Sequence, residues 1–269
     1  MKNVRTLLLA LFLLARAASA LECTPALVAS APGPTVTLTW VSDVPLFKLW
    51  YPRAHAHGLR VLAIPESNVT GQRVRSMGVP TLPHAPENAI LPITRCFVDS
   101  GVSVLVLDVD AMLTGNVLAL AERSGADVAT IMEDQRNNAT QPGSCLAVAY
   151  FKAGEPAASL LRLAQDIFEQ NPIRALMQQS FARAIHEWTA ADPAANAALA
   201  AAYERARYSC QAQVATVGGL APLRIAYLPY DASVKAHPTD AKCRNVACAG
   251  DSWVVHCFGS MLCAESISY

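Results

Sequence analysis

Two aspartates separated by one residue, Asp108 and Asp110, form the pattern in the chain with the clearest chemical potential. They follow directly on residues 103–107 (SVLVL), an unbroken apolar run that predicts a buried strand. In open α/β sheets, ligands bind beyond the carboxyl ends of the strands, so both carboxylates are expected at a ligand site. Carboxylates this close repel each other, and a hard divalent cation such as Mn²⁺ or Mg²⁺ would neutralise them and stabilise charge on a phosphate. The simpler alternative is two solvated acids at the start of a helix at Ala111.

Short β-rich runs alternate with helical stretches on both sides of this pattern. We expect strands over residues 35–41, 59–64, 103–107, 127–131 and 223–228. We expect helical segments near residues 46–50 (ended or kinked by Pro52), 90–100, 160–168, 173–188 and 194–207, with a loop over 65–88. The alternation predicts a single α/β domain with a mostly parallel, Rossmann-like sheet flanked by helices.

The first 20 residues have the features of a secretory signal peptide. Lys2 and Arg5 give a basic start, residues 7–15 are apolar, and an Ala-Ser-Ala sequence ends at Ala20. We expect cleavage after Ala20. The alternative is an uncleaved signal anchor, although this apolar stretch is short for a membrane span of about 20 residues.

Composition limits the classes of protein that remain. The chain has 269 residues, of which 53% are hydrophobic and 16% charged, and its 21 basic residues balance its 21 acidic ones. This composition excludes a disordered chain and does not favour a nucleic-acid partner. Behind the signal peptide (1–20) we expect an extended lead-in over 21–34 and one domain over 35–269, with no stable membrane span.

Cysteines and glycosylation sequons also fit a secretory route. All eight cysteines follow the signal peptide, and four gather near the C-terminus: Cys243, Cys248, Cys257 and Cys263. In an oxidising compartment these four are disulfide candidates, while their spacing beside His256 leaves a zinc site as an alternative. Two sequons make Asn68 and Asn138 candidates for N-glycosylation. We therefore expect the protein in the ER or Golgi lumen, or secreted.

The segments around the two aspartates resemble the nucleotide-diphospho-sugar transferase family, glycosyltransferases of the GT-A type with a D-x-D motif. TLTWVSDVPLFKLWYPRAHAHGLRVLAI resembles the opening strand, helix and second strand of that family, and TRCFVDSGVSVLVLDVDAM resembles the segment that runs into D-x-D. ADVATIMED, FKAGEPAASLLRLAQDIFEQNP, LRIAYLPYDAS and VVHCFGS are similar to later segments. The resemblance covers most of residues 35–259, and its strong part is short.

The resemblance implies a role for each candidate site residue. Asp110 would be the main metal ligand, and Asp108 would face the ribose or share the metal. His256 would complete the metal shell or contact a phosphate, and Arg95 stands in the place of a basic residue on the donor side. The implied activity is metal-dependent transfer of a sugar from a nucleotide-diphosphate donor to a glycan or glycoprotein acceptor, with retention of the anomeric configuration and Mn²⁺ or Mg²⁺ as cofactor.

Two positions depart from the family pattern. Gly143-Ser144-Cys145 replaces the family's Asn-Ser/Thr-Gly, and Gln178-Gln179 stands where the family has Asp-Gln. Both places help to shape the acceptor side of the site in the family. The departures leave open an altered acceptor or a chain that binds the donor without transferring its sugar.

Two readings from other classes compete with glycosyl transfer. VLVLDVDAMLTGN also resembles the first motif of haloacid-dehalogenase-type phosphatases, in which Asp108 would be the nucleophile and Asp110 the general acid/base. Against it, Met112 replaces the threonine that contacts phosphate, and no second acid follows Asp251 in the late acidic motif. The other reading is a secreted sugar- or nucleotide-binding domain without chemistry, which metal-dependent nucleotide binding and turnover would separate from the enzyme.

Overall fold

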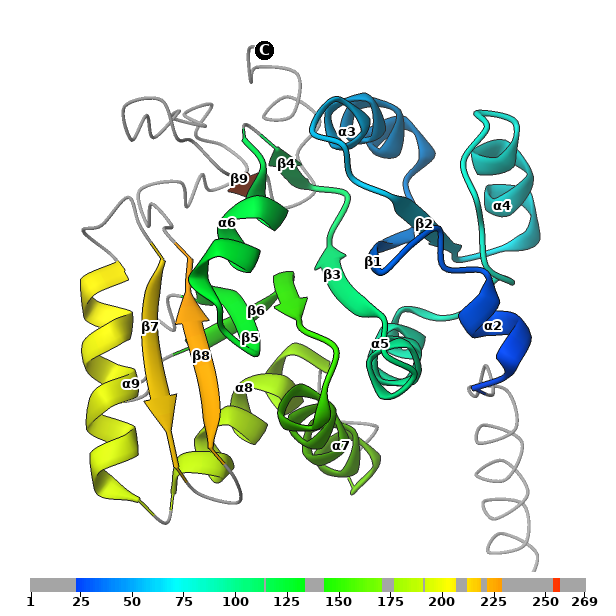
Figure 1. Ribbon diagram of the computed structural model, residues 1–269. Helices are drawn as coiled ribbons and strands as arrows, with labels where there is room; N and C mark the ends of the chain where they lie inside the picture. The colour runs from blue at the N-terminus through cyan, green and yellow to red at the C-terminus, as the bar shows by residue number, and fades with distance from the viewer. Residues whose placement is uncertain are drawn as a thin grey trace, which may run out of the picture.

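The computed structural model (Figure 1) describes residues 23–113, 115–133, 143–170, 177–190, 192–206, 212–218, 222–228 and 254–256. The expected signal peptide, Asn138 and the four C-terminal cysteines lie outside these residues. The strands of the described part are β1 (Thr35–Val41), β2 (Val61–Pro65), β3 (Ser103–Leu107), β4 (Ala111–Leu113), β5 (Val128–Glu133), β6 (Gly143–Phe151), β7 (Gln213–Val217), β8 (Leu223–Tyr227) and β9 (Val254–His256). The helices are α2 (Pro25–Ala29), α3 (Val44–Ala56), α4 (Asn68–Arg75), the 3₁₀ turn η1 (Glu87–Ala89), α5 (Ile90–Asp99), α6 (Val117–Ser124), α7 (Glu155–Gln170), α8 (Met177–Thr189) and α9 (Pro193–Ala206).

Seven of these strands form one mixed sheet in the order β2-β1-β3-β6-β5-β8-β7, and β4 pairs with β9 in a second, small sheet. The pairs β1–β2, β1–β3 and β5–β8 are parallel, whereas β3–β6, β5–β6 and β7–β8 are antiparallel. The expectation of a mostly parallel sheet was therefore wrong. The reason is chain length between strands: a parallel crossover needs a dozen or more residues, and the links β5 to β6 and β7 to β8 are shorter.

Helices cover both faces of the large sheet. The apolar residues of α5, α7, α8 and α9 share one core with one face of the strands, and those of α3, α4 and α6 share a second core with the other face. In β3, Val104 and Val106 point into the first core while Leu105 and Leu107 point into the second. This explains the unbroken apolar run of β3, because a strand buried on both faces has no solvent-facing position. The expectation of an α/β domain flanked by helices is confirmed.

Local elements differ from expectation in several places, and the strands β4, β6, β7 and β9 were not among those expected. Within residues 65–88, expected as loop, Ser67 caps α4 by accepting a hydrogen bond from the Thr70 amide at 3.2 Å. α3 continues through Pro52 instead of ending there. Lys48 and Pro52 are both exposed, so the carbonyl that loses its N–H partner faces solvent. Within residues 21–34, expected to be extended, five residues form α2.

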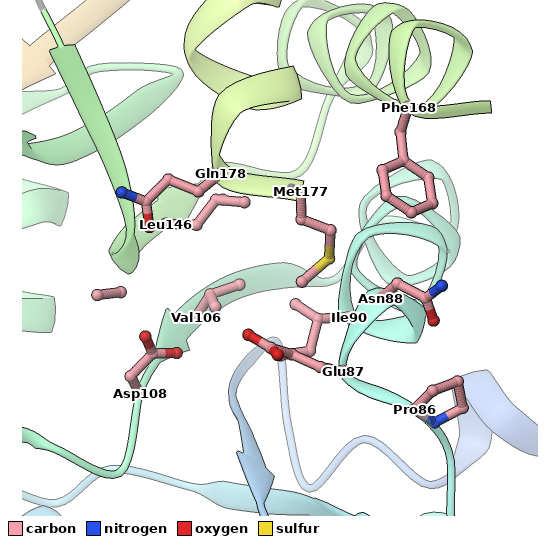
Figure 2. Close-up of a pocket in the computed structure, with 11 residues that line it drawn as sticks. Pro86, Glu87, Asn88, Ile90, Val106, Asp108, Leu146, Phe168, Met177 and Gln178 are labelled. Carbon is pink, nitrogen blue, oxygen red and sulfur yellow. The ribbon is translucent and has the colours of Figure 1, made fainter. Parts of the chain in front are cut away.

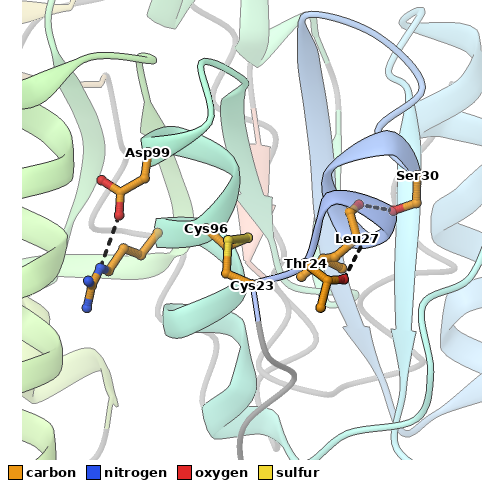
Figure 3. The surroundings of a disulfide bond; sticks show 7 residues. Cys23, Thr24, Leu27, Ser30, Cys96 and Asp99 are labelled. Carbon is orange, nitrogen blue, oxygen red and sulfur yellow. Dashed lines mark hydrogen bonds and ion pairs between the residues drawn. A yellow bond between two sulfur atoms is a disulfide. The ribbon is translucent and has the colours of Figure 1, made fainter.

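The start of the described chain is fastened to α5 by a disulfide. Cys23 bonds to Cys96 across 73 residues of sequence, and Figure 3 shows α2 following directly after this bond. Thr24 caps α2, because its hydroxyl accepts a hydrogen bond from the Leu27 amide at 3.2 Å. The helix and the bond together hold the N-terminal segment against the core that contains Leu27. Within the described part of the chain, every helix is too short or too polar to cross a membrane.

Candidate functional site

Asp108 and Asp110 lie where the order of the parallel strands reverses. From β1 the chain goes to β2 on one side, and then to β3 on the other side. In open α/β sheets such a reversal opens a crevice outside the carboxyl ends of the strands, and ligands bind there. β3 ends at Leu107, so Asp108 is the first residue beyond its carboxyl end. The sequence placed both aspartates correctly at the end of this strand.

Hydrogen bonds fix the turn that carries the two aspartates. The Asp108 amide donates to the Ala147 carbonyl at 2.9 Å, and the Ala111 amide donates to the Asp108 carbonyl at 3.0 Å. On the far side of the turn, the buried Trp50 indole N–H donates to the Ala111 carbonyl at 3.0 Å. Asp108 and Asp110 are themselves partly exposed. The backbone is thus held on both sides while the two acidic residues remain accessible to a ligand.

The residue after this turn pairs with the late histidine. The chain beyond Asp110 continues as the strand β4. The alternative of two acids at the start of a helix was therefore wrong. β4 pairs antiparallel with β9, and Ala111 faces His256 in this register. Facing residues in an antiparallel pair have Cα atoms about 4.5–5.5 Å apart, so the backbone of His256 lies next to the turn. Figure 1 shows β4 and β9 side by side at one end of the molecule.

A cavity of about 410 Å³ opens beside Asp108. Its apolar wall comes from the strands, α5, α7 and α8: Ile90, Val106, Leu146, Ala147, Phe168 and Met177. Its other lining residues are Pro86, Glu87, Asn88, Asp108 and Gln178. A cavity of this size, mostly apolar with a few polar groups, has the features of a small-molecule site.

The cavity brings in one residue that the sequence analysis had singled out and one that it had missed. Gln178, a departure from the family pattern, stands at the start of α8 and lines the cavity. Glu87 lies in the segment expected as loop, and Figure 2 shows its carboxylate and that of Asp108 pointing into the same space. An acid in the first turn before a helix usually indicates only a helix start, so the sequence carried no chemical signal for Glu87.

Arg95 is not brought together with Asp108. Its guanidinium pairs with Asp99 at 3.2 Å and donates to the Gln165 side chain of α7 at 3.1 Å. Asp99 also pairs with Arg162 of α7 at 3.2 Å. Arg95 lies five residues beyond Ile90, about 7.5 Å further along α5, and does not line the cavity. These contacts give Arg95 a part in joining α5 to α7.

Within the part of the chain that the structure describes, the candidate metal ligands at this turn are Asp108 and Asp110. Among the described residues, no group of three or more His, Cys, Asp or Glu side chains lies close enough to hold a metal ion. Two carboxylates still fit Mg²⁺ or Mn²⁺, which commonly bind one or two carboxylates together with substrate phosphates and water. Tight binding of the metal is then expected only together with the phosphates of a ligand.

Three other residues named in the sequence analysis can be placed. Met112, which weighed against the phosphatase reading, is fully buried in β4, so this position offers no group to a phosphate. Asn68 is exposed in the first turn of α4, as a glycosylated asparagine must be. Cys145, part of the Gly143-Ser144-Cys145 departure from the family pattern, is buried in β6.

Comparisons with known proteins give only a partial structural likeness. No family model and no curated protein sequence matches this chain significantly. The apo-form glycosyltransferase GlyE of Streptococcus pneumoniae TIGR4 is 12% identical, with a TM-score of 0.37, over 57% of this chain and 43% of that one. A second structure of GlyE is 14% identical, with a TM-score of 0.37, over 55% of this chain and 41% of that one. The match thus spans less than half of GlyE, and the function has to be argued from the site.

Proposed function

We propose that this protein is a metal-dependent glycosyltransferase of the GT-A type that uses a nucleotide-diphosphate sugar as donor. The observation that carries the proposal is the position of Asp108 and Asp110, at the carboxyl end of β3 where the strand order reverses, beside a cavity of about 410 Å³. Paired carboxylates at this edge suit a ligand that brings both a divalent cation and phosphates.

Each part of the site has a role in this proposal. Asp110 and Asp108 would hold Mn²⁺ or Mg²⁺, which when bound neutralises charge on the departing nucleotide diphosphate. His256, whose backbone pairs with Ala111, would contribute to the metal or to a phosphate. The cavity lined by Phe168, Met177 and Gln178 would receive a sugar. Trp50 would position the turn through its hydrogen bond to the Ala111 carbonyl.

The same proposal includes a place in the secretory pathway and a glycan or glycoprotein acceptor. The disulfide between Cys23 and Cys96 supports an oxidising compartment, because such bonds form and persist there and are rare in reducing ones. It lies just after the expected cleavage point at Ala20, so the mature chain would keep it.

Metal-dependent binding of a nucleotide diphosphate tests the proposal. The full chain is titrated with UDP and with GDP by calorimetry, in Mn²⁺ and again in EDTA. We expect binding only with the metal, a loss of at least about tenfold in Asp110→Asn, and no loss in Asp166→Asn, an exposed acid on α7. Affinity that is the same in EDTA, or equal in the two variants, would contradict the proposal. Release of free sugar from a bound donor would then separate an enzyme from a binding protein.

A further inference from the structure

The cavity beside Asp108 carries two acidic side chains. Among the described residues that line it, Glu87 and Asp108 are acidic and none is Lys, Arg or His. Figure 2 shows the two carboxylates pointing into the same space from different elements, with the Gln178 amide extending above Asp108. The Asn88 amide points away from them. The polar side of the cavity therefore offers hydrogen-bond acceptors and negative charge, together with one amide.

The opposite side of the cavity is apolar. Phe168 from α7, Met177 from α8 and Ile90 from α5 form this wall, and Phe168 presents an aromatic ring. A sugar ring has hydroxyl groups at its edge and C–H groups on its faces. Carboxylates and an amide accept from hydroxyls, and aromatic and thioether groups pack against C–H groups. The cavity matches such a ligand on both sides.

We propose that the cavity selects neutral or amino sugars and rejects sugar acids, and that Glu87 is the residue that sets this selectivity. That the ligand is a sugar rests on the function proposed above; the charge preference rests on the lining residues alone. In that function the charge of Asp108 is shared with the metal. Glu87 belongs to η1, a separate element, so its charge remains to repel a ligand carboxylate and to attract an ammonium group.

Because Glu87 is exposed, its effect on an anionic ligand should be screened by salt. A preference that comes from shape alone would not change with ionic strength. A preference that comes from the Glu87 charge should shrink as ionic strength rises from about 10 mM, where the Debye length is about 30 Å, to about 1 M, where it is about 3 Å.

The experiment measures the affinity of the full chain for matched neutral and acidic sugars. Methyl glucoside, methyl galactoside, glucosamine, glucuronate and galacturonate are titrated by ligand-observed NMR at low ionic strength. We expect the uronates to bind at least about tenfold more weakly than the corresponding glycosides. The difference should shrink in Glu87→Gln and reverse in Glu87→Lys. The control Glu187→Gln, an exposed acid on α8 paired with Arg183, should behave as the wild type does.

Several outcomes would overturn the inference. These are uronates that bind as well as the neutral sugars, no binding of any of the sugars, or a preference that Glu87→Lys leaves unchanged. Loss of Mn²⁺-dependent UDP or GDP binding in Glu87→Gln would show that Glu87 instead holds a cation. A neutral-sugar preference without metal-dependent nucleotide binding would refute the proposed function and leave this inference standing. Metal-dependent nucleotide binding without a neutral-sugar preference would refute this inference and leave the proposed function standing.

Discussion

Ala111 and His256, far apart in the sequence, face each other in the two-stranded sheet of β4 and β9. Ala111 follows Asp110 directly, and its carbonyl accepts the hydrogen bond from the Trp50 indole. The late segment of the chain is therefore attached to the one turn that carries both aspartates. A substitution in β4 or β9 is therefore expected to shift the turn that carries Asp108 and Asp110.

The pairing predicts a contribution of His256 to metal-dependent nucleotide binding. Replacing His256 with Ala should raise the Kd for UDP or GDP in Mn²⁺ about tenfold, which is the scale on which changes around a metal site act. His55→Ala, an exposed histidine on α3, is the control and should leave the Kd unchanged. Calorimetry gives both values. An unchanged Kd in His256→Ala would reduce the proposed metal site to the two aspartates.

Two tryptophans hold the two acidic segments of the site, and their variants should have different effects. The Trp50 indole donates to the Ala111 carbonyl, and the Trp40 indole donates to the Ala85 carbonyl just before Glu87, each at 3.0 Å. Trp50→Phe should weaken Mn²⁺-dependent nucleotide binding, whereas Trp40→Phe should reduce the discrimination between neutral and acidic sugars. Each loses a hydrogen bond worth about 1 kcal/mol, with a further cost where the carbonyl stays buried. Equal effects of both variants on both measurements would indicate general destabilisation instead of local positioning.

Loss of the disulfide between Cys23 and Cys96 should destabilise the fold. The bond closes a long loop, and removing such a bond from a domain costs about 2–5 kcal/mol of unfolding free energy. Cys23→Ser is the cleaner variant, because Cys23 is exposed and Cys96 is buried. Urea denaturation of the variant and the wild type should show the difference under oxidising conditions and lose it in reductant. A difference that persists unchanged in reductant would show that the serine acts through something other than the bond.

Stability should decline above about pH 10 because of a buried tyrosine. Tyr227 is fully buried, and burial raises the pKa of its phenol above the ordinary value near 10. The folded chain then keeps a proton that the unfolded chain releases, so the stability is full below the unfolded pKa and falls as the pH rises past it.

Tyr227→Phe tests this decline. The variant should lose about 1 kcal/mol at neutral pH, because the Tyr227 hydroxyl lies 3.4 Å from the Ser144 hydroxyl, and should resist alkaline unfolding better than the wild type relative to that baseline. The half-buried Tyr51 provides a control in Tyr51→Phe, which should keep the wild-type pH dependence. Denaturant midpoints between pH 7 and about 11 give the comparison. Parallel pH profiles for all three proteins would exclude Tyr227 as the cause.

Some features of this protein follow from local sequence. The apolar run of residues 103–107 and the two aspartates after it gave both the strand β3 and the position of the aspartates at its carboxyl end. The helical stripes of α7 and α8 were also recognisable, because burial of one helix face leaves a periodic apolar pattern in the sequence. The helix α9 followed from its alanine-rich composition. These features depend on neighbours in the chain, and for that reason a linear pattern can carry them.

Only the tertiary structure decided which residues meet. The direction of β6 depends on the short link from β5, and the pairing of Ala111 with His256 depends on a return of the chain that no local pattern records. The contact of Arg95 with Gln165, which joins α5 to α7, was likewise absent from any local pattern. After β2 the chain passes through α4 to η1, and this path places Glu87 in the lining of the cavity beside Asp108. A carboxylate becomes part of a site through the elements that surround it in space, and those elements come from distant parts of the chain.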